Sequence, residues 1–231
     1  MNDQSISTFR RRVLVRYHPS AFLLAAQLLS LLLYAAFDGI RSERVVPGTF
    51  SVLVLALAVW VVSRSPAINW IAWAMAAPAF VLSLLSVLFV DVTLAAWSSL
   101  LKAALYFYTA GSLIAYMMQD ERVTGDELFA AGATFTLIAW GFAYVYLVCQ
   151  TWYPDSFIGH TRPGQPRTFV ELLFLSFTTL SAVGVGDVLP ITSAARVLVM
   201  FEQFIGVAYI ALVVSRLIGL TIVRAERKGS S

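Results

Sequence analysis

The chain is a succession of long apolar runs, and this feature constrains its fold more than any other. The runs lie at 21–37, 45–63, 67–90, 92–118, 128–151 and 191–223. They show no alternation of apolar and polar residues, which excludes a membrane β-barrel, and a helix needs about 20 such residues to cross a bilayer. With 59% apolar and 13% charged residues, a soluble domain is excluded, because soluble domains average about 45–50% and 25%. The sequence predicts an all-α membrane protein with six transmembrane helices.

Polar segments divide these spans into an N-terminal and a C-terminal part. The predicted divisions are a cytoplasmic N-terminal segment at 1–20, a four-helix membrane domain at 21–118, a connector at 119–127, a C-terminal membrane domain at 128–223 and a short tail at 224–231. The first run is 17 residues long, longer than the core of a signal peptide, so we expect it to be retained as a span. Nine basic loop and terminal residues on the side of both termini, against five on the other, predict cytoplasmic termini.

One segment, at 168–190, does not fit the pattern of spans. Its apolar part, 168–180, would form a helix of about 20 Å, too short for a hydrocarbon core of about 30 Å. Thr168 and Glu171 have the spacing of a capping box at its start. We therefore expect a re-entrant half-helix that enters the membrane and returns, with its negative C-terminal end pointing inward.

A short stretch with alternating glycines, Ala182-Val183-Gly184-Val185-Gly186, follows this half-helix. Glycine permits backbone angles that turn successive carbonyl groups toward one side. Four copies around an axis would form stacked rings of carbonyl oxygens that replace the water around a cation. Because one loop supplies a quarter of each ring, the working unit is expected to be a homotetramer.

The segment resembles the pore loop of the tetrameric potassium channel superfamily. Residues at the family's positions are Thr178, Thr179, Ser181, Val183, Gly184, Gly186, Asp187 and Pro190. The resemblance covers about 165–220 and looks like a two-helix pore module of small bacterial channels. The first four spans match only in number and hydropathy.

The resemblance implies a potassium-permeable channel, with passive conduction in a bacterial inner membrane. Its ion-binding residues would be Ala182, Val183, Gly184, Val185 and Gly186, through their backbone carbonyls. Its filter-supporting residues would be Thr178, Thr179, Ser181 and Asp187. No cofactor or metal is implied beyond the permeant K⁺ ions.

The sequence departs from the family at two filter positions. Ala182 replaces a threonine whose hydroxyl completes the innermost ion site, and Val185 replaces an aromatic residue that braces the filter. Potassium permeation is still expected, with a weakened innermost site. A poorly selective monovalent cation channel is the main alternative.

The last run contains the gating candidates. Gly206 lies where the family has a hinge glycine in its inner helix, and close helix packing is the other interpretation. Below it, one helix face carries Val207, Ile210, Val214 and Ile218. Pointed inward in four copies, that face would line a hydrocarbon cavity that stops ions by shedding water. Arg216 lies off this face and is expected to reach the acidic connector at 120–127.

Two isolated charges lie within the spans. Lys102 is the one basic residue in 92–118, whereas a voltage sensor carries several arginines, so opening is expected to depend weakly or not at all on voltage. Glu202, in the last span, has two interpretations: it forms a hydrogen bond to the back of the half-helix, or it takes part in gating.

Other classes of protein fit the sequence less well. Gly184–Asp187 also fits the signature of intramembrane aspartyl proteases, but these need a second facing aspartate, and the candidates, Asp38 and Asp91, lie at span ends. A non-conducting membrane protein is a further alternative. The single cysteine and two histidines argue against structural zinc, and the net charge of +3 belongs to loops, not to a nucleic-acid surface. We expect no enzyme; the expected partners are the lipid bilayer and a regulatory subunit of unknown kind.

Overall fold

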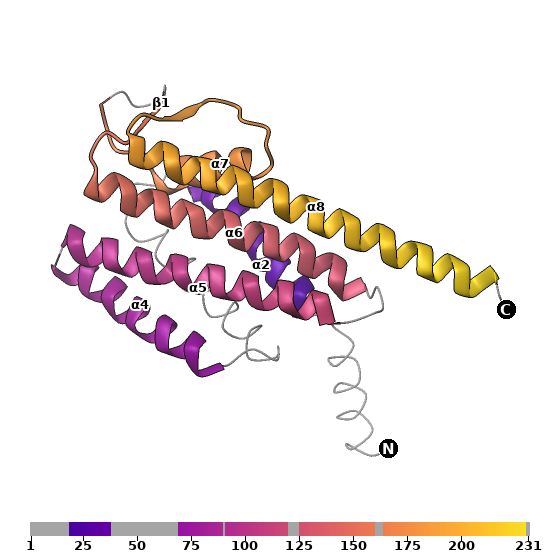
Figure 1. The fold of residues 1–231 in the computed structure, drawn as a ribbon. Coiled ribbons are helices and arrows are strands. Elements are labelled where there is room, and N and C mark those ends of the chain that lie inside the picture. Colours follow the sequence, from indigo (N-terminus) through magenta and orange to yellow (C-terminus); the bar gives the residue numbers. More distant parts are fainter. Residues whose placement is uncertain (1–18, 38–68, 90, 120–124, 160–163, 230–231) are drawn as a thin grey trace, which may run out of the picture.

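The computed structural model describes residues 19–37, 69–89, 91–119, 125–159 and 164–229. In chain order, the elements are α2 (Pro19–Phe37), α4 (Asn69–Phe89), α5 (Val92–Gln119), α6 (Gly125–Trp152), β1 (Phe157–Gly159), α7 (Phe169–Leu180), β2 (Val188–Pro190) and α8 (Ser193–Gly229). Figure 1 shows long helices packed side by side, with α7 and the strands at the end where α6 finishes and α8 begins. The architecture is mainly helical, as predicted.

Each described long helix coincides with a predicted apolar run, and the run at 45–63 lies outside the described residues. Among the described helices, α5, α6 and α8 are long and apolar enough to cross a membrane. The apolar stretches identified in α2 and α4, Ser20–Tyr34 and Trp73–Ser86, are shorter. A membrane protein is therefore supported, while the count of six spans stays a prediction.

Two helices extend beyond their predicted bounds. α6 begins at Gly125, inside the predicted connector, with Asp126 and Glu127 in its first turn, where acidic side chains favour the positive end of the helix dipole. α8 continues to Gly229, inside the predicted tail. Its last residues include Ala, Glu, Arg and Lys, which are strong helix formers, so the loss of hydrophobicity does not end the helix.

α6 is the centre of the bundle and packs against α2, α5, α7 and α8. An aromatic cluster surrounds Trp140 of α6 and includes Tyr34 of α2, Tyr106 of α5 and Phe169 of α7. Phe169 also lies 4.6 Å, between ring centroids, from Tyr144. Buried aromatic pairs of this kind stabilise packing by about 0.5–1.5 kcal/mol each beyond area burial. The cluster fixes the first residue of α7 against the helices that precede it in the chain.

A two-stranded antiparallel ribbon joins the segment after α6 to the segment before α8. β1 pairs with β2 in a register that places Phe157 opposite Pro190 and Gly159 opposite Val188. The Ile191 N–H extends the ladder by donating to the Ser156 carbonyl at 2.8 Å. The turn-rich stretch at 152–167 gives no sequence signal for this strand, because three residues are too few to show a period.

Candidate functional site

α7 coincides with the short apolar stretch at 168–180, and its start is fixed by its own side chains; that it re-enters a membrane stays a prediction. The Thr168 hydroxyl accepts from the Glu171 N–H, while the Glu171 carboxylate accepts from the Thr168 N–H at 2.7 Å, so the capping box is confirmed. Arg167 forms an ion pair with Glu171, with 3.5 Å between nitrogen and oxygen. At 12 residues, the helix is about 18 Å long. Its last residue, Leu180, is buried.

The backbone after α7 alternates in handedness. Ala182 has φ +58°, Gly184 +58° and Gly186 +79°, and the intervening Val183 and Val185 are not among the residues with positive φ. Alternation of this kind turns successive peptide groups the same way round. The predicted glycine geometry is present, with a third left-handed residue at Ala182 that the sequence did not indicate.

Hydrogen bonds fix the direction of these peptide groups. The N–H groups of Val183 and Gly184 both donate to the Thr178 carbonyl, at 2.9 and 3.0 Å. The N–H and C=O of a planar trans peptide point in opposite directions, and the described residues contain no cis peptide. The carbonyls of Ala182 and Val183, which share those peptide planes, therefore point away from α7. The side chains of Val183 and Val185 are 68% and 59% exposed in the single chain.

The predicted supporting hydroxyls hold the end of α7. The Thr178 hydroxyl donates to the Leu175 carbonyl at 2.9 Å, and the Ser181 hydroxyl donates to the Phe177 carbonyl at 2.7 Å. Thr179 is buried, and its carbonyl accepts from the Ala182 N–H at 3.0 Å. The carbonyls of Phe177 and Thr179 belong to the last turn, which a helix end leaves unpaired, so the contacts of Ser181 and Thr179 shape the turn into 182–186.

The other end of the loop is held by the ribbon. Asp187 is half-buried and directly precedes β2. Gly159 of β1 faces this point: a Cβ there would lie 2.9 Å from Arg167 Nη1 and 3.4 Å from the Asp187 carbonyl oxygen. Arg167 is itself buried and exchanges backbone bonds with the Gln150 side chain. Sequence reasoning missed Gly159 and Arg167, because neither belongs to a local motif.

Residues 132–222 match the family model described as "Ion channel". This part of the chain is similar to ion channel domains. The matched stretch runs from α6 into α8 and includes the whole 168–190 segment, so the resemblance found in the sequence is confirmed. Neither a curated protein nor a solved structure matches the chain significantly.

One face of α8 carries the residues that the sequence predicts to line a pore. Its predicted gating residues are all exposed in the single chain: Val207, Ile210, Val214 and Ile218. The neighbouring Tyr209 points the other way, is buried, and donates its hydroxyl to the Ala131 carbonyl at 2.6 Å. The structure thus groups the four residues on one uncovered side of the helix.

Gly206 packs against the end of α7. A Cβ at this position would lie 2.2 Å from the carbonyl oxygen of Leu180, a contact that no side chain can make. α8 is one uninterrupted helix through this residue. The close-packing interpretation is therefore the one the structure favours, and hinge bending at Gly206 stays a prediction.

Three further side chains occupy defined places in the domain. Arg216 pairs with Glu127 at the start of α6, with 3.2 Å between nitrogen and oxygen, which confirms the expected reach to the connector. Lys102 donates to the Ser83 hydroxyl at 3.1 Å and lies 5.6 Å from the centre of the Tyr144 ring. Glu202 accepts from the Tyr146 hydroxyl and contacts the Ser176 hydroxyl of α7, as one of its two interpretations anticipated.

The structure describes one of the two aspartates considered as partners of Asp187 in a protease. Asp91 is exposed and its carboxylate accepts from the Thr93 N–H at 2.7 Å, so it caps α5. Asp38 lies outside the described residues. In the part of the chain that the structure describes, no group of three metal-binding side chains occurs either.

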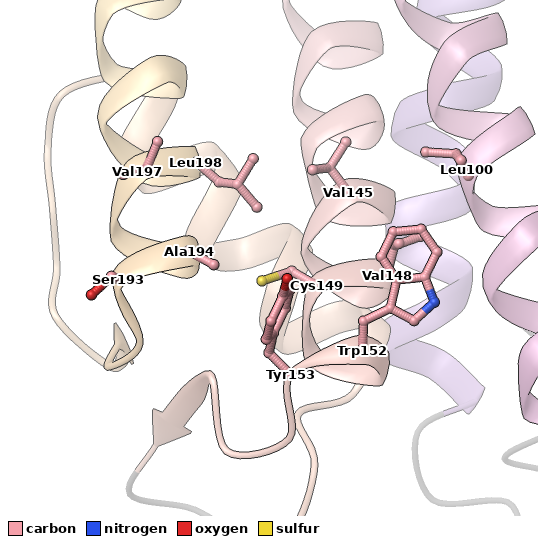
Figure 2. A pocket seen from close by; sticks show the side chains of 10 residues that line it. All are labelled: Leu100, Val145, Val148, Cys149, Trp152, Tyr153, Ser193, Ala194, Val197 and Leu198. Carbon is pink, nitrogen blue, oxygen red and sulfur yellow. The ribbon is translucent and has the colours of Figure 1, made fainter.

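A cavity of about 540 Å³ lies where α5, α6 and the start of α8 meet (Figure 2). Its lining is mainly apolar and includes Val145, Val148 and Val197. Cys149 also lines it, with its sulfur 3.8 Å from the Ser156 hydroxyl. A cation needs oxygen ligands to replace its hydration shell, and this mainly apolar lining offers few of them.

Proposed function

We propose that four copies of the chain form a pore for passive potassium conduction, with the carbonyl groups of 182–186 facing the axis. The observation that carries this proposal is the pair of N–H groups on Val183 and Gly184 that point back at Thr178. Their partner carbonyls point away from α7 and are free to meet copies of themselves. A single chain offers one quarter of such a ring.

The position of α7 supports the same proposal. Its C-terminal end, which carries a partial negative charge, stops next to residues 182–186. In four copies, the four ends would stabilise a cation that has lost part of its water. The carbonyl oxygens would then replace the lost water, as in other carbonyl-lined filters.

Assembly is supported by surface that the single chain leaves uncovered. α8 exposes large apolar side chains along its length, among them Phe201, Phe204 and Val207. A closed ring of identical subunits would place α8 inside and α4 outside. Glu127 lies at the start of α6, whereas the ribbon that holds the loop follows the end of α6, so we assign the Arg216–Glu127 pair to the cytoplasmic side. Both termini are expected on that side. The bacterial inner membrane is the expected location.

Selectivity is the open part of this function, and one observation favours a weakly selective pore. Val185 is exposed and cannot donate the hydrogen bond by which the family aromatic braces the filter. Ala182 has φ +58°, a backbone angle at which a β-branched threonine would be an outlier. The local backbone therefore suits the alanine found here better than the threonine of the family. The second candidate function is therefore a poorly selective monovalent cation channel.

The deciding experiment measures K⁺ flux into liposomes containing the purified protein. Gly184→Ala and Gly186→Ala should each lower flux strongly, because φ values of +58° and +79° are strained for an L residue and each variant would add a second such residue to a loop that already holds Ala182 at +58°. Gly164→Ala is the matched control: Gly164 also has positive φ, +72°, with open space around it, but it precedes α7. Normal flux in both filter variants contradicts the proposal, and repeating the assay with Na⁺ separates the two candidate functions.

A further inference from the structure

A buried cluster of oxygens joins the three helices of the channel domain. It consists of Glu202 of α8, Tyr146 of α6, Ser176 of α7 and the Ala139 carbonyl of α6. The three side chains are fully buried. Tyr146 contacts Glu202 Oε2, Ser176 Oγ contacts Glu202 Oε1, and Ser176 Oγ lies 2.8 Å from the Ala139 carbonyl oxygen.

Counting protons determines how these contacts are made. There are three contacts between oxygens at hydrogen-bonding distance, and each needs a proton between the two atoms. Tyr146 and Ser176 supply one hydroxyl proton each, and a backbone carbonyl supplies none. If Glu202 were ionised, one of the two Ser176 contacts would bring lone pairs face to face. A proton on the carboxyl group removes this conflict, because each of the three contacts then has its own hydrogen.

We propose that Glu202 is a neutral carboxylic acid that donates its proton to Ser176 and so positions α7 between α6 and α8. In this arrangement, Tyr146 donates to Oε2, Glu202 donates from Oε1 to Ser176, and Ser176 donates to the Ala139 carbonyl. Every hydrogen in the cluster is used once, and every contact is a hydrogen bond.

The surroundings of Glu202 agree with a neutral group. The elements packed against it face it with Tyr146 and Ser176, and neither is cationic. The ion pairs between described residues lie elsewhere and join Arg167 to Glu171 and Arg216 to Glu127. An unpaired carboxylate away from water is costly, and a neutral carboxyl group avoids that cost.

The bond from Glu202 reaches the part of α7 that carries the filter. Ser176 is two residues from Thr178, whose carbonyl receives the N–H groups of Val183 and Gly184. One helical turn along α8, Gly206 contacts Leu180 at the end of α7. Glu202 affects ions only by positioning α7. Its effect on conduction therefore rests on the proposed function.

Glutamine is the matched substitution for a neutral glutamic acid. In Glu202→Gln, the amide oxygen can accept from Tyr146 and the amide N–H can donate to Ser176, which preserves all three bonds. We expect K⁺ flux and the K⁺/Na⁺ flux ratio to stay within about twofold of the wild type. Glu202→Ala leaves two buried hydroxyls without their partner, which should lower flux about tenfold or change the ratio.

Infrared spectroscopy of the protein in lipid at neutral pH reads the proton directly. The wild type should show the C=O stretch of a protonated carboxylic acid, shifted in D₂O and absent from Glu202→Gln. Tyr146→Phe removes the bond to Oε2, the carbonyl oxygen of the acid, and should move this band to higher wavenumber. This readout requires no ion flux, and a purely structural carboxylate would not produce it.

The two measurements fail separately. If the wild type lacks the band, or if Glu202→Gln is as damaging as Glu202→Ala, Glu202 is ionised and the inference is overturned. The band can also be present, shift in D₂O and respond to Glu202→Gln and Tyr146→Phe as expected while neither the wild type nor any variant conducts K⁺. In that case the proton assignment stands and the proposed channel function is wrong.

Discussion

α6 and α8 are similar in length and apolar character, but they differ in how much of each is buried within the chain. Both are continuous apolar helices long enough to cross a membrane, yet 67% of the most apolar stretch of α6 is buried within the chain, against 22% for α8. α6 packs against four helices. α8 contacts α6, α7 and β2, and many of its side chains whose burial is described are exposed.

The difference shows which helix is complete within one copy. α6 satisfies its packing with residues of its own chain, so it works as the internal support for α7. α8 uses one narrow face, with Glu202, Gly206 and Tyr209, to hold α7 and α6. Its other faces carry exposed apolar side chains that lipid or further copies must cover. Substitutions on each face should therefore distinguish packing within the chain from contact with lipid or further copies.

The largest effect is expected on the narrow packed face. Gly206→Ala would place a methyl group 2.2 Å from the Leu180 carbonyl oxygen, and a backbone atom cannot move aside without displacing α7. Overpacking of this kind costs about 1–3 kcal/mol, occasionally more. We expect loss of flux and a lower unfolding temperature in detergent.

Gly219→Ala is the control for this substitution. Gly219 lies on the same helix, and a methyl group added there would have nothing within 4 Å of it, so alanine should stabilise the helix by up to about 1 kcal/mol. If Gly206→Ala instead unfolds at the wild-type temperature and changes only the open fraction, Gly206 is a hinge and the packing interpretation is wrong.

The next effect concerns the uncovered face that we assign to the pore. Val214→Asn or Ile218→Asn should raise resting conductance about tenfold, the equivalent of removing a dewetting barrier of roughly 1.4 kcal/mol. Leu212→Asn is the control, since Leu212 is also exposed but lies two residues from Val214 and so on another side of the helix. Equal increases in all three variants would mean that this face does not line the pore.

Much of the fold could be predicted because hydrophobicity and caps are local signals. The described helices coincide with apolar runs, and the α7 start followed from Thr168 and Glu171 alone. The helix ends were harder: α6 and α8 continue into polar sequence, because helix propensity does not end where hydrophobicity does. The β1–β2 ribbon was missed because it pairs segments about 30 residues apart.

For the candidate site, the glycines at 184 and 186 predicted the backbone conformation of the loop. The side chains that hold α7 and this loop in place could not be predicted from the sequence. Tyr146 and Ser176 are ordinary residues in apolar runs, and only packing brings them to Glu202. The positive φ of Ala182 has no sequence signal either. Threonine at this position is therefore a poor repair for the missing hydroxyl, contrary to what the family pattern implies.

A smaller effect is expected where α8 returns to α6. Arg216→Gln breaks the ion pair with Glu127. The Arg216 side chain is 17% exposed and the Glu127 side chain is 4% exposed. For a pair still partly in contact with water, we expect about 1 kcal/mol, or roughly a fivefold shift between open and closed channels. Glu127→Gln should shift opening similarly, and the double variant should add little. Additive shifts, or a changed K⁺/Na⁺ ratio, would show that the two residues act independently of one another.

The smallest effect is expected from Lys102, on the side of α6 away from α8. Its amine donates to Ser83 of α4 at 3.1 Å and lies 5.6 Å from the Tyr144 ring centre in α6, so it is held between three helices. A voltage sensor must move its charge through the field, at about 2.3 kcal/mol per charge per 100 mV, and a lysine fixed in this way cannot. The conductance–voltage relation should report less than about one gating charge per chain, unchanged in Lys102→Gln. Ser83→Ala, which frees the amine from its partner on α4, serves as the control for local packing. A steep voltage dependence that flattens in Lys102→Gln but persists in Ser83→Ala would show that this charge moves, and that the support around α6 is not static.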